Sequence, residues 1–338
     1  MLLLNQRFEN FIRWTRPEPE TMADISRQRD DVRSRVRGQA EEDGLTVRST
    51  PNSGSFATAT GLRRHMRGLS EVEGQDVDVP FVVAPKTEDD ERLEVLLPRF
   101  EKYARISYPD TERETSKSSV KLKFTSNLSY DLVPLLATRD RDRQILIRAD
   151  GERRETSVQK HVEFITSRTK KGLTTGVAVE FNELIRLGKW WRCVRQAEDG
   201  SSLTDVPSFL INLLFAHAFD VRGLRETYAA TTADWFGHLA RVVRKRIPIS
   251  FSDYGTGPAA STAPSTVWAV HDPVNPDNNI VSKWTGIMCD GLAEWLEEGR
   301  DAMYDAMAAF DDDRETDGID HLVKVLGTAF IPHSEAAT

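Results

Sequence analysis

Three aspartates and a glycine–serine pair are the residues of this chain whose types and order best fit catalysis. Gly54-Ser55 follows a short run of turn residues, Asp76 and Asp78 flank one position of an apolar segment, and Asp131 lies in a second apolar segment. Carboxylate oxygens bind Mg²⁺ or Mn²⁺, and two such ions can activate a hydroxyl and stabilise a leaving pyrophosphate. The set therefore predicts nucleotidyl transfer, with the three aspartates as catalytic residues that bind two metal ions.

Two predicted strands position the aspartates. Residues 77–83 are apolar and β-branched, which indicates a buried strand. Asp76 and Asp78 stand at positions i and i+2, so both carboxylates are expected on one face. Residues 128–136 predict a neighbouring strand that carries Asp131. Pro80 lacks an N–H, which indicates an edge position or a bulge just after the acidic pair.

Gly54-Ser55 is expected to bind the phosphates. A glycine lets the backbone approach a phosphate closely, and Ser55 adds a hydroxyl donor. A helix that begins at Ser55 and runs through Leu62 would also present unpaired N–H groups and a positive dipole. The pair alone has little specificity, and so has the Asp-x-Asp pattern. Their order on the correct elements is the informative feature.

The rest of the chain predicts an α+β protein. Apolar residues recur at helical spacing over residues 5–42, interrupted at 16–19 because two prolines so close cannot lie inside one helix. A helix is expected at 89–103, and short strands at 45–50, 120–124 and 144–148. Helical patterns then dominate, at 158–168, 177–195, 207–219, 234–246 and 279–310. We expect a catalytic lobe at residues 1–155 that includes the N-terminal helices, a helical lobe at 156–332, a tail at 333–338, and a cleft between the lobes.

Composition limits the possible partners. The chain has 338 residues, a net charge of −8, 39% hydrophobic and 29% charged residues, which is typical of a folded, soluble protein. The acidic balance argues against a long nucleic-acid partner. No apolar run approaches the roughly 20 residues of a membrane span. The two cysteines lack metal-ligand spacing, and none of the seven histidines has a ligand pattern. A cytoplasmic enzyme with no membrane contact is expected.

The motifs resemble those of the polymerase-β-type nucleotidyltransferases. The matching segments are Gly54-Ser55-Phe56-Ala57, Asp76-Val77-Asp78 and Tyr130-Asp131-Leu132-Val133-Pro134. Three later segments narrow the resemblance to one branch, namely residues 184–191, 207–210 and 272–279. Together they are similar to the bacterial cGAS/DncV-like nucleotidyltransferases (CD-NTases), which are related to oligoadenylate synthase. The resemblance covers most of the chain, from about residue 50 to residue 330.

That resemblance implies a polymerase-β-like lobe packed against an oligoadenylate-synthase-like helical lobe. It implies an enzyme of a CBASS anti-phage system that condenses ATP, with or without another NTP, into a cyclic di- or trinucleotide, with cyclic adenylate expected. Residues 272–279 and 326–330 look most like the members that make cyclic adenylates under the control of HORMA-domain proteins, so the resemblance implies a HORMA-domain or other regulatory partner. By the same resemblance Ser55 would bind the triphosphate, Lys189 would reach its β- or γ-phosphate, and Ser208 would add a hydroxyl. The gap before Asp76 is longer than in the family, with the extra residues expected to loop out at 65–75.

Several alternatives stay open at this point. Lys189 also fits a solvated helix lysine, and Lys121 and Lys123 fit surface charges as well as a nucleotide contact. Residues 272–279 fit a turn in which Asn278 and Asn279 cap the next helix, as well as a base contact. Trp190, Trp191 and Phe209 are assigned to the core. A linear-chain polymerase, a transferase for a small molecule, protein or tRNA, and a non-catalytic nucleotide-binding scaffold are the competing functions.

Overall fold

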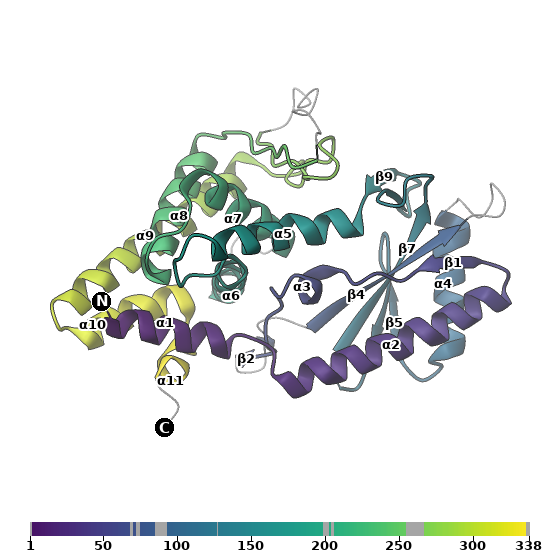
Figure 1. Cartoon of the computed structure of the whole chain (residues 1–338), viewed down its shortest axis with the longest axis horizontal. Helices are drawn as coiled ribbons and strands as arrows, with labels where there is room; N and C mark the ends of the chain where they lie inside the picture. The colour runs from purple at the N-terminus through teal and green to yellow at the C-terminus, as the bar shows by residue number, and fades with distance from the viewer. Residues whose placement is uncertain are drawn as a thin grey trace. The chain divides into compact units, whose positions relative to one another are not determined.

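The computed structural model describes residues 2–67, 70–71, 75–84, 93–126, 128–198, 203, 206–254 and 267–335. The chain divides into two compact units, each of which combines separate stretches of sequence (Figure 1). The sheet unit comprises Pro17–Gly61 and Gly74–Glu163. The helical unit comprises Met1–Arg16, Leu62–Glu73 and Phe164–Thr338.

The sheet unit contains a seven-stranded mixed sheet. Five strands follow the order β1-β4-β7-β6-β5, and β8 and β9 continue from β7. The central strands β4 and β7 are parallel, whereas the other pairs are antiparallel. The strands are β1 (Thr46–Ser49), β4 (Gln75–Ala84), β5 (Glu112–Thr115), β6 (Val120–Lys123), β7 (Leu128–Ala137), β8 (Gln144–Ile147) and β9 (Arg153–Thr156). The predicted strands are therefore confirmed, and β5 and β9 were not predicted.

One face of the sheet forms the core of this unit. Alternate residues such as Val77, Val79 and Tyr130 are buried in one hydrophobic cluster with helices α2 (Pro19–Glu42) and α4 (Leu93–Ser107). Since side chains of a strand alternate between faces, the intervening residues of β4 and β7 point to the opposite face. The strand pattern thus explains why the acidic side chains lie away from this core. The helix expected at 89–103 corresponds to α4, and its expected start at residues 89–92 lies outside the described residues.

The edge position predicted for Pro80 holds only locally. Strand β4 is central overall, but β1 pairs only with its residues Val82 to Ala84. Pro80 therefore lies beyond the reach of β1, while its other neighbour is Val133 of β7. A residue without an N–H is tolerated where one side of a strand has no ladder. The acidic residues come just before it, in the part of β4 that pairs with β7.

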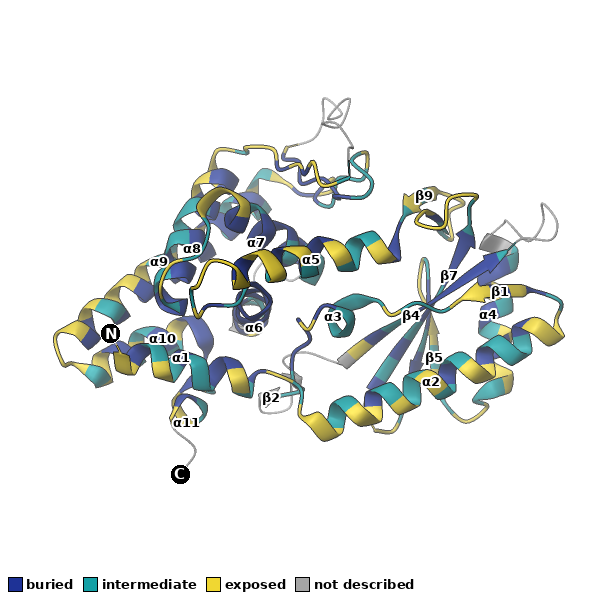
Figure 2. Cartoon of the chain, viewed as in Figure 1, coloured by how far each residue is buried: buried dark blue, intermediate teal, exposed yellow. Residues whose placement is uncertain are grey.

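The helical unit is built around a second, larger core. Its helices are α1 (Leu2–Trp14), α5 (Val158–Leu173), α6 (Phe181–Glu198), α7 (Ser208–Arg222), α8 (Tyr228–Arg244), α9 (Gly286–Asp311), α10 (Glu315–Leu326) and α11 (Phe330–Ser334). Figure 2 shows α6 and α7 largely buried, as the core helices of this unit. A two-stranded ladder, β2 (Met66–Arg67) with β3 (Ser70–Glu71), lies in the segment expected to loop out at 65–75.

The N-terminal helices divide between the units, which differs from the expected lobe at 1–155. The aromatic ring of Phe11 packs against Phe330 at 5.1 Å and against Trp190 at 5.6 Å between ring centroids, so α1 belongs to the helical core. The proline pair after Arg16 separates α1 from α2, which joins the sheet unit. The second division falls within α5, at residues 163 and 164, rather than at 155.

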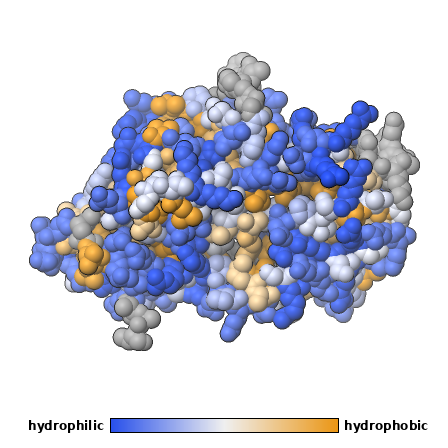
Figure 3. All heavy atoms as spheres, in the orientation of Figure 1, coloured by the Kyte–Doolittle hydropathy of each residue, from blue (hydrophilic) through white to orange (hydrophobic). Residues whose placement is uncertain are grey.

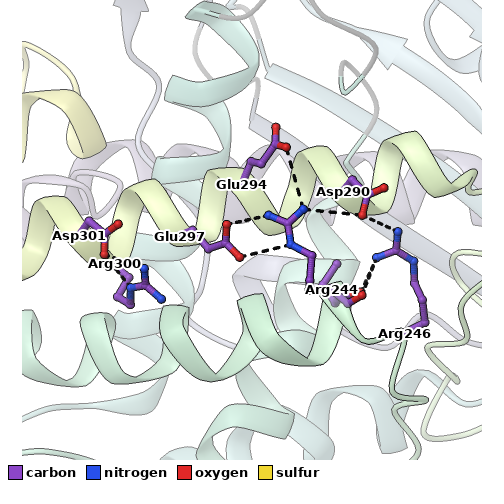
Figure 4. Close-up of polar contacts among 8 residues, drawn as sticks. Arg244, Arg246, Asp290, Glu294, Glu297, Arg300 and Asp301 are labelled. Atoms are coloured by element: carbon purple, nitrogen blue, oxygen red, sulfur yellow. Dashed lines mark hydrogen bonds and ion pairs between the residues drawn. The ribbon is translucent and has the colours of Figure 1, made fainter.

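Surface charge is abundant on both units. Figure 3 shows a face dominated by hydrophilic residues, with hydrophobic residues in separate patches. Figure 4 shows ion pairs between α8 and α9, where Arg244 contacts Glu297 at 2.7 Å. Arg246, just after α8, contacts Asp290 at 2.7 Å. Within the described part of the chain, no helix combines the length and apolar character that crossing a membrane requires.

Candidate active site

The three predicted aspartates lie on one face of two paired strands. Asp78 of β4 is directly opposite Asp131 of β7 in the parallel ladder, and Asp76 is opposite Ser129. Residues in register on neighbouring strands project to the same side, so all three carboxylates share the face opposite the α2–α4 core. The predicted placement on two adjacent strands is confirmed. The Asp-x-Asp pair and the lone Asp, taken with the strand patterns that carry them, were sufficient to find it.

A lysine that the sequence did not assign to the site lies among these carboxylates. Lys121 of β6 is opposite Asp131 in the antiparallel ladder, on the other side of β7 from β4. Its Nζ donates to Asp76 Oδ2 at 2.9 Å and lies 3.6 Å from Asp131 Oδ2. Ser119 Oγ donates to Asp131 Oδ1 at 3.2 Å. The alternation of residues 120–124 puts Lys121 on the face away from the core, but its pairing with Asp131 depends on the register between β6 and β7.

Burial and charge oppose one another at this site. Burial raises the pKa of Asp131, the Lys121 ammonium lowers it, and the charge of Asp76 raises it, with a net upward shift. Burial alone would lower the pKa of Lys121, but the hydrogen bond to Asp76 and the charge of Asp131 raise it overall. Lys121 is therefore a firmly charged ammonium that compensates two carboxylates.

The donor set suits a hard divalent cation. Mg²⁺ and Mn²⁺ prefer carboxylate oxygens, and three carboxylates lie on one face of two hydrogen-bonded strands. Over the described residues, however, no three His, Cys, Asp or Glu side chains are gathered as ligands of a metal ion. The Lys121 ammonium joins Asp76 and Asp131 instead. Metal binding would therefore require that this ammonium move.

Gly54 lies directly beside the acidic residues. Its φ is +69°, and a Cβ at this position would lie 2.0 Å from Oδ2 of Asp78. Any side chain would therefore collide with the carboxylate, in addition to the strain of a left-handed backbone. The turn that contains Gly54-Ser55 and the aspartate pair consequently form one continuous site within the sheet unit. This juxtaposition is what the order of motifs predicted.

The helix expected from Ser55 to Leu62 is wrong in its length. Helix α3 covers only Gly54–Ala57, because the positive φ of Ala59, +56°, cannot continue a right-handed helix. A single turn has little macrodipole. Phosphate binding here would thus depend on the backbone of Gly54 and the hydroxyl of Ser55 rather than on a long helix.

Arg33 is a second residue that the sequence analysis missed. It lies on α2, and its Nη2 donates to the carbonyl oxygen of Pro51 at 2.8 Å and to Asn52 Oδ1 at 3.0 Å. These contacts fix the turn that leads into Gly54. The helical pattern of residues 19–42 predicts the helix but gives no sign that this arginine reaches the turn.

Lys189 and Ser208 lie in the helical unit, whereas the aspartates lie in the sheet unit. Lys189 is on α6 and is only 2% exposed, so the solvated-surface alternative for this lysine is wrong. It continues a buried polar stripe along α6, with Asn182, Glu183 and Arg186. Burial, with the charge of Arg16, lowers the pKa of Arg186 to about 9. Ser208 is the first residue of α7 and is partly exposed.

Residues 272–279 form a closed turn. Asp272 Oδ1 accepts hydrogen bonds from the backbone N–H groups of Val274 at 2.8 Å and Asn275 at 3.3 Å. Asn278 Nδ2 donates to Asp272 Oδ2 at 3.2 Å. The prediction that Asn278 and Asn279 cap the following helix is wrong, because Thr285 is the N-cap of α9. These contacts support a turn with a structural role at residues 272–279 rather than a base contact.

Comparisons with known proteins agree with this geometry. Residues 1–168 match the family model described as "Second Messenger Oligonucleotide or Dinucleotide Synthetase domain". A cyclic AMP-AMP-AMP synthase from Escherichia coli (strain MS 115-1) is 27% identical over 286 residues, which cover 82% of each protein.

Solved structures share the fold across nearly the whole chain. The E. coli MS115-1 protein CdnC, solved with ATP, superposes with a TM-score of 0.77 at 24% identity and covers 96% of this chain and 98% of its own. Vibrio cholerae DncV, solved with ATP and GTP, gives a TM-score of 0.70 at 13% identity and 99% coverage of both chains. These structures establish the polymerase-β-like fold of the α+β class. Together with the family match and the curated relative, they show that this chain belongs to the bacterial cGAS/DncV-like nucleotidyltransferases, a family of cyclic oligonucleotide synthases.

Proposed function

We propose that this protein condenses ATP, alone or with another NTP, into a cyclic di- or trinucleotide, with a cyclic adenylate as the expected product. The observation that carries the proposal is the parallel register of Asp78 and Asp131 beside Gly54. That arrangement joins candidate metal ligands to a turn whose left-handed backbone and close approach to Asp78 favour glycine. The name of the E. coli relative, cyclic AMP-AMP-AMP synthase, supports adenylate as the substrate.

In this proposal Asp76, Asp78 and Asp131 hold two Mg²⁺ or Mn²⁺ ions. When bound, such ions lower the pKa of an attacking hydroxyl and neutralise charge on a leaving pyrophosphate. The hydrogen bond from Ser119 orients the carboxylate of Asp131, whose side chain is 18% exposed. The α-phosphate is then attacked in line by a ribose hydroxyl, and repetition of the step followed by ring closure gives the cyclic product.

Binding of the triphosphate is assigned to four residues. The backbone of Gly54 can approach the phosphates closely, and Ser55 donates its hydroxyl. We assign a phosphate contact to Lys189 as a point charge, with Ser208 adding a hydroxyl.

The biological setting is part of the same proposal. We infer that the product is a second messenger of a CBASS anti-phage system and that a HORMA-domain protein regulates its synthesis. The support is that the E. coli MS115-1 protein CdnC has been solved as a complex with HORMA. The superposition covers 96% of this chain and 98% of CdnC.

Product analysis tests the proposal. The protein is incubated with labelled NTPs and Mg²⁺ or Mn²⁺, with and without a HORMA-domain partner, and the mixture is treated with phosphatase. A phosphatase-resistant cyclic adenylate, identified by mass spectrometry, is the expected result. A ladder of linear products would indicate a linear-chain polymerase instead. Absence of pyrophosphate release under every condition would contradict any nucleotidyl transfer.

A further inference from the structure

We propose that Lys121 is a competing cation, which holds the acidic site in a metal-poor state until a nucleotide arrives. The inference rests on the proposed function, since it takes Asp76 and Asp131 as metal ligands. It adds to the proposed function a role for Lys121, which determines how tightly the acidic site binds metal ions.

Geometry places the Lys121 ammonium where a cation is needed. It donates to Asp76 Oδ2 at 2.9 Å and lies 3.6 Å from Asp131 Oδ2, so it joins carboxylates that come from two different strands. Only 26% of its side chain is exposed, and 18% of the Asp131 side chain. The contact with Asp131 is therefore partly shielded from solvent, where charges interact more strongly than at an open surface, whereas the Asp76 side chain is 51% exposed.

Lys123, two residues along the same strand, shows what an ordinary surface lysine does here. It lies on the same face of β6 and contacts Glu112 and Glu114 at 3.0 Å each. Those partners are 70% and 65% exposed, and they belong to the outer strand β5. The two lysines thus differ in their partners rather than in their strand or face, which makes Lys123 a matched control.

A bound ammonium and a divalent ion cannot share the same carboxylates without repulsion. A free divalent ion must displace Lys121 from Asp76 and Asp131 and then remain close to its charge. A metal ion that arrives on a nucleotide triphosphate brings negative phosphates, which offset that repulsion. The acidic site is therefore expected to bind free metal weakly and to fill efficiently when the nucleotide binds.

The test measures metal affinity without turnover. Binding of free Mn²⁺ to the nucleotide-free protein is followed by electron paramagnetic resonance for the wild type, Lys121→Met and Lys123→Met. Loss of one nearby positive charge is expected to tighten Mn²⁺ binding by roughly tenfold in Lys121→Met. No change is expected in Lys123→Met. With a non-hydrolysable ATP analogue present, the gain in Lys121→Met should shrink.

Different results overturn different parts of the account. Equal Mn²⁺ affinity in the two lysine variants would overturn the role of Lys121, and a gain undiminished by the ATP analogue would overturn its coupling to nucleotide. Asp131→Asn in the Lys121→Met background separates this from the proposed function. If that double variant keeps the tight Mn²⁺ binding, the ion is not at the acidic site and the proposed function fails. Thermal unfolding verifies folding, and Lys121→Gln replaces Lys121→Met if the latter does not fold.

Discussion

The acidic strands of the sheet unit and the turn at residues 272–279 both carry aspartates within motifs that stand out in the sequence, but the structure uses them differently. Asp272 accepts hydrogen bonds from the backbone of its own turn and from Asn278, so its carboxylate serves local folding. Asp76 and Asp131 instead contact a cation from another strand. A carboxylate whose hydrogen bonds close its own loop stabilises structure, whereas carboxylates brought together from separate strands are available for chemistry.

This comparison also separates two kinds of glycine. Gly54 and Gly151 both have a positive φ, of +69° and +80°. A Cβ on Gly54 would collide with Asp78, while a Cβ on Gly151 would meet nothing within 4 Å. A positive φ therefore occurs both in the turn at Gly151 and at the candidate site. The Asp78 carboxylate beside Gly54 is what distinguishes the two glycines.

The largest expected effect is the loss of a candidate metal ligand. Asp131→Asn keeps the size and much of the hydrogen bonding of the side chain but removes its charge. We expect pyrophosphate release to fall by roughly a thousandfold or more, since metal ions supply most of the charge stabilisation in such reactions. Asp142→Asn, at an exposed position in the turn between β7 and β8, serves as the control. Near wild-type turnover in Asp131→Asn would remove this residue from the active site.

A smaller loss is expected from Gly54→Ala. The added methyl group must push the Asp78 carboxylate or the turn aside, and a shift of about 1 Å can lower a rate roughly a hundredfold. Gly151→Ala carries similar backbone strain of about 1–2 kcal/mol but has open space around it. Steady-state kinetics and thermal unfolding of both variants separate strain from collision. Equal activity in the two would show that the collision with Asp78 does not matter.

Asp272→Ala should affect stability rather than catalysis. It removes three hydrogen bonds that close the turn, each worth about 1 kcal/mol, so the free energy of unfolding should fall by about 2–4 kcal/mol. Turnover per folded molecule should stay near the wild-type value. Asp277→Ala, at an exposed position of the same turn, should change neither the free energy of unfolding nor the turnover. Loss of activity with unchanged stability in Asp272→Ala would instead favour a base contact.

The smallest expected effect belongs to charges that face solvent. Arg244→Gln breaks the contact with Glu297 between α8 and α9 (Figure 4). Since both side chains are more than a third exposed, the free energy of unfolding should change by less than about 1 kcal/mol. Chemical denaturation in low and high salt measures the change. A loss of several kcal/mol would mean that this network holds the two helices together.

The sequence predicted the central parts of the site because they depend on local patterns. Alternation and β-branched residues located the strands, and the positions of Asp76, Asp78 and Asp131 on them then determined a shared face. The break after Arg16 was also visible, because two prolines interrupt a helix. These features need no knowledge of distant contacts.

The remaining errors concern contacts that no local pattern encodes. Apolar spacing could not show that α1 packs with Phe330 in the helical unit while α2 joins the sheet unit. The end of α3 depends on the left-handed backbone of Ala59, an unusual conformation for that residue. Lys121 was set aside as a surface charge because its proximity to Asp76 arises only across three strands of the folded sheet.

The location of bound metal tests the central claim most directly. Crystals of the protein grown with Mn²⁺ and a non-hydrolysable ATP analogue would give anomalous scattering peaks at the manganese absorption edge. Two peaks are expected, coordinated by the carboxylates of Asp76, Asp78 and Asp131, with the Lys121 ammonium moved away from Asp76. Manganese bound elsewhere, while Lys121 still joins Asp76 and Asp131, would contradict it.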